Sequence, residues 1–235
     1  MSKTYLQVIN SIHARARGAT VTDINTDADT TLIAAFINTA KEQVETEWKW
    51  HPLRKTITFT SVIGTASYDT SSAMIATVTQ TNERSMLLWD AEQPDAGMFW
   101  DATVNGQFRM TVAGRDAVLA YIRTSNNQNA TDAPGTVAVY PNGSGLTVLF
   151  ADTPTAVRNY TFEVYSPQNE LTAKDDIILA PWQPIRDLAC AMAAEERGDM
   201  FGISAARFYD FYADSLAQAI AAQTDNQYDD AMVVV

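Results

Sequence analysis

The chain has 235 residues, of which 28 are Asp or Glu and 16 are Lys or Arg, so its formal net charge is −12. Such acidity repels phosphate backbones, which argues against sequence-specific or wrapping nucleic-acid binding. The single cysteine, Cys190, excludes an intrachain disulfide and fits synthesis in the reducing cytoplasm. No stretch predicts a membrane span, and residues 1–9 lack the apolar run of a signal peptide.

The two ends of the chain predict four amphipathic helices. Residues 4–17 and 29–50 form the first pair, and residues 184–197 and 204–222 form the second. Each segment has apolar residues three or four positions apart, which gives a helix one apolar stripe. Because such a stripe must be buried against another element, we expect the two pairs to form one four-helix base.

Between the helical ends the hydrophobic period changes to two residues, which is typical of half-buried β-strands. Turn residues such as Asn105-Gly106 separate several strands and favour antiparallel hairpins. The fold class is therefore α+β, with an antiparallel β domain, either a sandwich or a small barrel, inserted into the helical base. The predicted strands are residues 55–61, 76–81, 85–89, 107–112, 117–122, 136–140, 146–150 and 160–165.

These elements predict four segments along the chain. Residues 1–54 are the first half of the helical base, residues 55–172 the inserted β domain, residues 173–226 the second half of the base, and residues 227–235 an extended C-terminal tail. Six basic and six acidic side chains leave the first segment neutral, while six and eleven give the β domain a charge of −5. The remaining residues carry four and eleven, so their charge is −7.

Three tryptophans are expected to anchor the base. Trp48 and Trp50 stand at the exit of the second helix, where large rings usually wedge one layer against another. We place them at the seam between the base and the β domain. Trp182 stands between Pro181 and Pro184, at the entrance of the third helix.

The C-terminal tail is expected to bind another subunit. After a polar, acidic stretch that includes Tyr228, the sequence continues with the apolar residues Met232, Val233, Val234 and Val235. Such a segment gains free energy by docking, for example as an added strand, so we assign these five residues to a partner-binding surface. The alternative is a frayed terminus.

No catalytic or metal-binding set is complete in the sequence. Only His13 and His51 accompany the single cysteine, so no zinc-site spacing can be written, and structural roles are favoured over a Ser-His-Asp triad. The acidic residues 23–29 resemble the start of a calcium loop, but Ala28 and Ala34 replace its glycine and its closing glutamate. We therefore expect a helix-capping loop, no enzyme activity and no cofactor.

Several loose motifs at the two ends of the chain resemble one family. The opening half contributes Leu32-Ile33, Asn38-Thr39-Ala40-Lys41, Val44-Glu45, Trp48-Lys49-Trp50 and Leu53-Arg54. The closing half contributes Leu149-Phe150, Pro154, Tyr160, Val164-Tyr165, Leu171, Asp175, the run from Ile177 to Pro181, and Ala193-Ala194-Glu195-Glu196-Arg197-Gly198. Together they resemble bacteriophage head-to-tail adaptor (connector) proteins, of the tail tubular protein A type of short-tailed phages and related siphophage adaptors. Residues 70–135 show no such resemblance.

The resemblance implies a ring of about twelve copies in the neck of the virion, with the helices forming the ring body. It implies that the portal protein and the tail or nozzle proteins are partners. The C-terminal residues, assigned to a partner-binding surface by their composition, are then expected to contact the portal or a neighbouring subunit. DNA is then ejected through the central channel without specific binding. An acidic bore fits this passage because like charges repel, although ordinary solubility explains the same acidity.

A carbohydrate- or receptor-binding β module on a helical base is the alternative function. Such a module needs exposed aromatic side chains gathered on one β surface. Trp89, Phe99 and Trp100 are the residues that can supply this patch.

Overall fold

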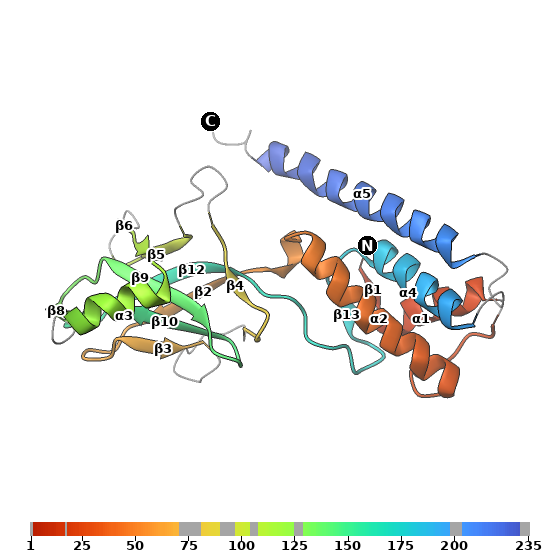
Figure 1. The fold of residues 1–235 in the computed structure, drawn as a ribbon, viewed down its shortest axis with the longest axis horizontal. Helices are drawn as coiled ribbons and strands as arrows, with labels where there is room; N and C mark the ends of the chain where they lie inside the picture. Colours follow the sequence, from red (N-terminus) through yellow and green to blue (C-terminus); the bar gives the residue numbers. More distant parts are fainter. Residues whose placement is uncertain are drawn as a thin grey trace. The chain divides into compact units, whose positions relative to one another are not determined.

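The chain divides into two units (Figure 1). The helical unit consists of Met1–Leu53 and Gln168–Val235, and the β unit consists of Arg54–Pro167. For residue 197 and residues 225–230, only the backbone is described. The computed structural model describes residues 2–16, 18–70, 81–89, 97–103, 108–124, 129–197 and 204–230.

Four of the described α-helices belong to the helical unit. α4 contacts each of the other three, and α5 lies along it (Figure 1). A two-stranded antiparallel sheet of β1 and β13 and the short helix η1 complete the unit. The bounds are β1 (Lys3–Thr4), α1 (Tyr5–Arg15), α2 (Ala28–Glu47), η1 (His51–Leu53), β13 (Ile177–Ile178), α4 (Trp182–Arg197) and α5 (Ala205–Asp230).

Polar caps fix the starts of α1 and α2. The Thr4 hydroxyl accepts a hydrogen bond from the Gln7 backbone N–H, and the Gln7 side chain accepts one from the Thr4 backbone N–H. This reciprocal pair is a capping box, which satisfies two donors that the helix leaves open. Asp27 caps α2 in the same way, because its carboxylate accepts the Thr30 backbone N–H at 2.6 Å.

The end of α2 differs from the prediction. The helix was expected to reach residue 50, but it ends at Glu47, and Trp48 has an extended backbone with φ −150° and ψ 150°. Once residue 48 leaves the helix, the Val44 carbonyl loses its usual backbone donor. The Trp50 indole N–H donates to that carbonyl at 2.7 Å and so stabilises the early exit.

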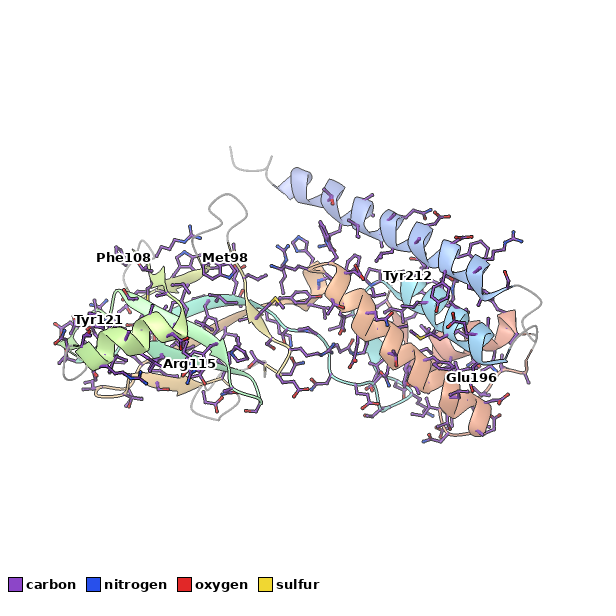
Figure 2. The ribbon with its side chains drawn as sticks, in the orientation of Figure 1. Met98, Phe108, Arg115, Tyr121, Glu196 and Tyr212 are labelled. Atoms are coloured by element: carbon purple, nitrogen blue, oxygen red, sulfur yellow. The ribbon has the colours of Figure 1, made fainter. Side chains whose placement is uncertain are left out.

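α4 and α5 are buried to very different extents. Among the described side chains of α5, only Phe208 is buried. Its apolar stripe is half-buried and comprises Phe211, Tyr212, Leu216, Ala219 and Ile220 (Figure 2). The buried residues of α4 are Pro184, Ile185, Asp187, Leu188, Ala189, Cys190, Ala191, Ala193 and Ala194. The central helix is therefore enclosed by its neighbours, whereas α5 rests on the unit with much of its surface uncovered.

Two larger sheets and a two-stranded sheet of β8 and β11 build the described part of the β unit. One of the larger sheets has the strand order β2-β12-β5-β6, with β4 also paired to β12, and the other has the order β3-β10-β9-β7. Most pairs are antiparallel, but β7 pairs with β9 and β8 pairs with β11 in parallel. The bounds are β2 (Arg54–Thr60), β3 (Ser67–Asp69), β4 (Met86–Leu87), β5 (Phe99–Asp101), β6 (Phe108–Arg109), β7 (Thr111–Val112), β8 (Ala130–Thr131), β9 (Thr136–Pro141), β10 (Leu146–Phe150), β11 (Thr153–Pro154) and β12 (Asn159–Tyr165).

Aromatic rings fill the core of the β unit. Phe59 on β2 lies 5.0 Å from Tyr68 on β3, and Phe150 on β10 lies 4.7 Å from Tyr160 on β12, measured between ring centroids. Phe99 on β5 contacts the Phe150 ring at 6.3 Å. Each of these contacts joins one sheet to the other, so the core lies between the two inner faces.

The mixed α+β class is confirmed, but the small barrel is wrong. Within the described ranges neither sheet closes on itself. The inner faces of the two larger sheets pack against each other, with aromatic rings between them. The predicted strand 117–122 is also wrong, because helix α3 (Arg115–Thr124) occupies it (Figure 1). Val118, Leu119 and Ile122 lie on one helical face and pack over β9 and β10.

The other strand predictions had mixed outcomes. The predicted strands at 55–61, 136–140, 146–150 and 160–165 correspond to β2, β9, β10 and β12. The segment 107–112 is split into β6 and β7, and the strand at 85–89 shrinks to β4. Most of the predicted strand 76–81 lies outside the described residues.

The helical C-terminus is longer than predicted. Residues 227–230 were expected to be extended, but α5 continues through Asp230. No glycine or proline interrupts residues 205–230, so nothing in the sequence breaks the helix earlier. Residues 231–235 lie outside the described residues.

Candidate interaction sites

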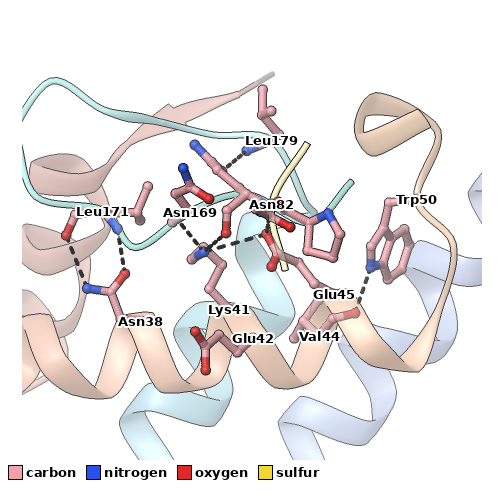
Figure 3. A network of polar contacts seen from close by, with 12 residues as sticks. Asn38, Lys41, Glu42, Val44, Glu45, Trp50, Asn82, Asn169, Leu171 and Leu179 are labelled. Atoms are coloured by element: carbon pink, nitrogen blue, oxygen red, sulfur yellow. Dashed lines mark hydrogen bonds and ion pairs between the residues drawn. The ribbon is translucent and has the colours of Figure 1, made fainter. Parts of the chain in front are cut away.

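A buried ion pair on α2 holds the segment through which the chain returns to the helical unit (Figure 3). The Lys41 ammonium donates to the backbone carbonyls of Gln168 and Asn169 at 2.7 and 2.9 Å. It also lies 3.7 Å from the Glu45 carboxylate, and neither side chain is exposed. Glu45 in turn accepts the Gln168 backbone N–H at 3.1 Å. Buried charges are tolerated only when they are paired and hydrogen-bonded in this way.

We call these contacts of Lys41 and Glu45 the Lys41 clamp, and residues 168–171 the return segment. Asn38, one helical turn before Lys41 on α2, extends the clamp (Figure 3). Its carboxamide donates to the Leu171 carbonyl at 3.1 Å and accepts the Leu171 N–H at 3.0 Å. The side chain thus satisfies both backbone groups of Leu171, as a neighbouring strand would. It also donates to the Tyr5 hydroxyl, which donates to the Ala34 carbonyl at 2.6 Å. Burial raises the pKa of Tyr5, which therefore stays protonated. The return segment is thus held in place by these hydrogen bonds, although it belongs to no helix or strand.

The three predicted anchor tryptophans have different environments. Trp50 is fully buried inside the helical unit, with 1% of its surface exposed. Trp48 is half-buried at the C-cap of α2. Trp182 is half-buried at the first residue of α4, with the Lys3 ammonium 4.1 Å and the Arg186 guanidinium 5.0 Å from its ring centroid. Both cations gain cation–π attraction there.

A groove of about 950 Å³ surrounds Trp182 within the helical unit. The exposed side chains of Ile177 and Leu179 form one wall, and the backbone beside them is occupied by Gln168, whose carboxamide donates to the Ile177 carbonyl and accepts the Leu179 N–H. Lys3 and His51 are the charged or titratable residues of the lining, which has no carboxylate. The lining comprises Ser2, Lys3, Trp50, His51, Pro52, the run from Ile177 to Gln183, Ala219, Ala222 and Gln223. We call it the Trp182 groove.

A second groove of about 480 Å³ lies between α4 and α5, shares Ala219 and Ala222 with the first, and is lined by charged residues. The buried Asp187 carboxylate accepts Arg15 at 2.9 Å and Arg186 at 2.8 Å. Burial raises the pKa of the neighbouring Cys190 thiol to about 11, although Arg15 opposes the shift. The two guanidiniums and one carboxylate tie the end of α1 to α4, and the thiol between them is unreactive.

Sequence reasoning missed both polar clusters. Lys41 and Glu45 belong to the same helical face as Ile37 and Val44, so a charge on an apolar stripe was the available signal. Arg15 and Asp187 are far apart in sequence and gave no signal.

The two histidines and the acidic loop do not come together at one site. His13 is buried and its Nε2 lies 3.2 Å from the Thr30 hydroxyl, while His51 is exposed in η1. In the acidic loop, the Asp23 carboxylate accepts the backbone N–H groups of the following two residues, and Asp27 caps α2. Among the described residues, no three His, Cys, Asp or Glu side chains gather as a metal site requires.

The aromatic patch of the alternative function is not assembled. Phe99 is fully buried and stacks on Phe162 in the core. Trp100 is half-buried under the Arg109 guanidinium, and Trp89 alone of the three predicted residues is exposed, at 43%. Of the predicted partner-binding residues, Tyr228 lies in the last turns of α5, and residues 232–235 fall outside the described ranges.

An enclosed β unit and apolar grooves beside α5 are typical of a protein that binds other proteins. The sequence model of the SU10 adaptor protein family matches residues 3–234. The chain therefore belongs to the SU10 adaptor protein family, and it is a structural adaptor of a bacteriophage, located in the virion and in contact with other virion components. A search of curated proteins gave no match. Across the described ranges, no helix combines the length and apolarity needed to cross a membrane.

Proposed function

We propose that this adaptor forms a ring of about twelve copies in the virion neck, between the portal and the tail. Membership of the SU10 adaptor protein family carries the proposal. The half-buried stripe of α5 supports it, because a helix with one buried side chain leaves apolar surface for a neighbouring subunit. In this arrangement the helical unit, with its four α-helices, forms the ring body, as in the tail tubular protein A type that the sequence resembles.

The ring acts on DNA by repulsion and has no enzymatic activity. Each copy carries a formal net charge of −12, so a closed ring lines its bore with negative potential. DNA then crosses the channel during ejection without adhering to the wall. The portal binds one end of the ring and the tail or nozzle proteins bind the other.

Assembly with the portal protein of the same phage tests this function. Electron micrographs of the mixture should show rings stacked on the portal, and the adaptor alone should be smaller, because neighbours are held together by the portal. A portal preparation that binds no adaptor, or binds it without a ring, contradicts the proposal.

A matched pair of variants tests the role of α5. Ala213 on α5 and Ala35 on α2 are both exposed helical alanines. Ala213→Glu should prevent ring formation while leaving the melting temperature unchanged, because a buried charge opposes subunit packing. Ala35→Glu should assemble normally. Equal assembly by both variants excludes α5 from the subunit contact.

A further inference from the structure

The Trp182 groove is an apolar surface without a cover in the described chain. Ile177 and Leu179 expose 51% and 39% of their surfaces in it, above a floor made of Trp50, Ile178 and Ala180, which are at most 3% exposed. Its volume of about 950 Å³ is that of a site for a short peptide or a small ligand. Exposed aliphatic side chains in a groove of this size mark a binding surface.

We infer that the Trp182 groove receives the apolar residues 232–235 of a second copy of the chain. This inference rests on the proposed ring, because a neighbouring subunit must supply the segment. Met232 and the three valines that follow are aliphatic, as are the groove walls, and their burial is the main source of binding free energy.

Charge supports the same occupant. The groove contains Lys3 and His51 and no carboxylate, although the chain carries a formal net charge of −12. The apolar residues follow Asp229 and Asp230 directly, apart from one alanine. An apolar segment behind two carboxylates matches an apolar groove with a lysine at its edge.

The geometry of α5 disfavours the segment of the same chain. Ala219 and Gln223 line the groove, and α5 continues past Gln223 to Asp230, which carries the chain about 10 Å beyond the groove. Residues 232 and 233 stand two and three positions after Asp230, so they extend at most about 11 Å from it, and reversing direction uses part of that length. Met232 and Val233 therefore have almost no length left to reverse direction and enter their own groove, whereas those of a neighbour have no such limit.

The mode of docking follows from the occupied backbone of β13. One edge pairs with β1, and the Gln168 carboxamide bonds the other edge at Ile177 and Leu179. An added strand has no free backbone groups to join at these positions. The segment therefore binds by burying its side chains against Ile177, Leu179 and Trp182, and not by extending the sheet.

Cysteine cross-linking between two variants tests the inference. Leu179→Cys places a thiol in the groove of one copy, and Val234→Cys places one in the segment of the other. Cys190 is retained because it is fully buried. The two proteins are mixed, assembled on the portal, oxidised and resolved on a non-reducing gel, with rings counted by electron microscopy in the same sample.

We expect a disulfide-linked dimer of the two variants, about tenfold more abundant than with the control pair Val234→Cys and Ala35→Cys. Rings without the cross-link overturn the inference and leave the proposed function intact. A cross-link of Val234→Cys to the portal, or within one chain of a dilute double variant, also overturns it. The absence of both rings and cross-links overturns the inference and the proposed function together.

Discussion

The β unit and the helical unit differ in how completely they bury their apolar side chains. In the β unit the two sheets enclose their own aromatic core, and Phe99, Phe150, Tyr160 and Phe162 are completely buried. In the helical unit α4 is enclosed, but Phe208 is the sole buried residue among the described side chains of α5. The comparison indicates that the β unit buries its apolar side chains against one another, whereas the helical unit leaves much of the surface of α5 uncovered.

The largest expected effect comes from opening the aromatic core. Phe99→Ala should lower the free energy of unfolding by about 3–5 kcal/mol, because the ring leaves a cavity between Phe59, Phe150 and Phe162. Chemical denaturation followed by circular dichroism measures the loss. Phe108→Ala is the matched control, since Phe108 lies on β6 of the same sheet with 71% of its surface exposed (Figure 2). A loss below about 1 kcal/mol for Phe99→Ala would mean that the core is not closed.

In the helical unit, the Lys41 clamp on the return segment should make a large contribution to the free energy of unfolding. Lys41→Met should cost about 3 kcal/mol, because it leaves the buried Glu45 carboxylate without its cation. The double variant Lys41→Met/Glu45→Met should recover only the part of that loss that comes from the unpaired charge, because the backbone groups of Gln168 and Asn169 still lose their bonds to Lys41 and Glu45. Equal stability of the single and double variants would show that the ion pair contributes little beyond packing.

Local signals predicted much of the fold. The four helices of the helical unit were placed because each has an apolar stripe and, at Thr4 and Asp27, a visible cap. Strands β2, β9, β10 and β12 were placed because they are long enough to show alternation. Short strands such as β5 and β13 exist only through their partners, so two or three residues gave no period to detect.

The sites were harder to predict than the elements. Trp50 and Trp182 were singled out by residue type, but the groove beside them depends on residues from four separate segments of the chain. The Lys41 clamp binds backbone carbonyls, which have no signature in the sequence. Helix α3 was read as a strand because residues 117–122 are all apolar, and a short apolar run does not distinguish a strand from a helix.

Acid should weaken the β unit through Asp101. Burial alone raises the pKa of Asp101, but hydrogen bonds from Thr103 and the Arg158 guanidinium at 2.6 Å outweigh it and hold the pKa below its ordinary value. A carboxylate with a depressed pKa stabilises the fold above its unfolded pKa, and this contribution is lost as the pH falls through the folded value. Asp101→Asn should therefore cost about 1.5–3 kcal/mol at pH 7.

The pH dependence of that difference is the critical measurement. Denaturation of both proteins from pH 7 downward should show the curves beginning to converge below about pH 4, where the carboxylate of the unfolded wild-type chain takes up its proton, and converging further at the lower pH where the native carboxylate does so. A gap of constant size across this range would assign the loss to altered shape, and not to the charge of Asp101.

The smallest expected effect concerns the turn at Gly64, which connects the two larger sheets of the β unit. Gly64, between β2 and β3, has φ +80°, and an added Cβ there meets no atom within 4 Å, so any cost of Gly64→Ala comes from the backbone alone. The left-handed conformation should make that cost about 1 kcal/mol. Gly135, just before β9, also has open space but no positive φ, so Gly135→Ala should be neutral or slightly stabilising because it restricts the unfolded chain. Thermal melts of the two variants should therefore shift in opposite directions or by clearly different amounts. Identical melting temperatures would show that the turn at Gly64 relaxes freely, and the β unit would then be less rigid than its aromatic core indicates.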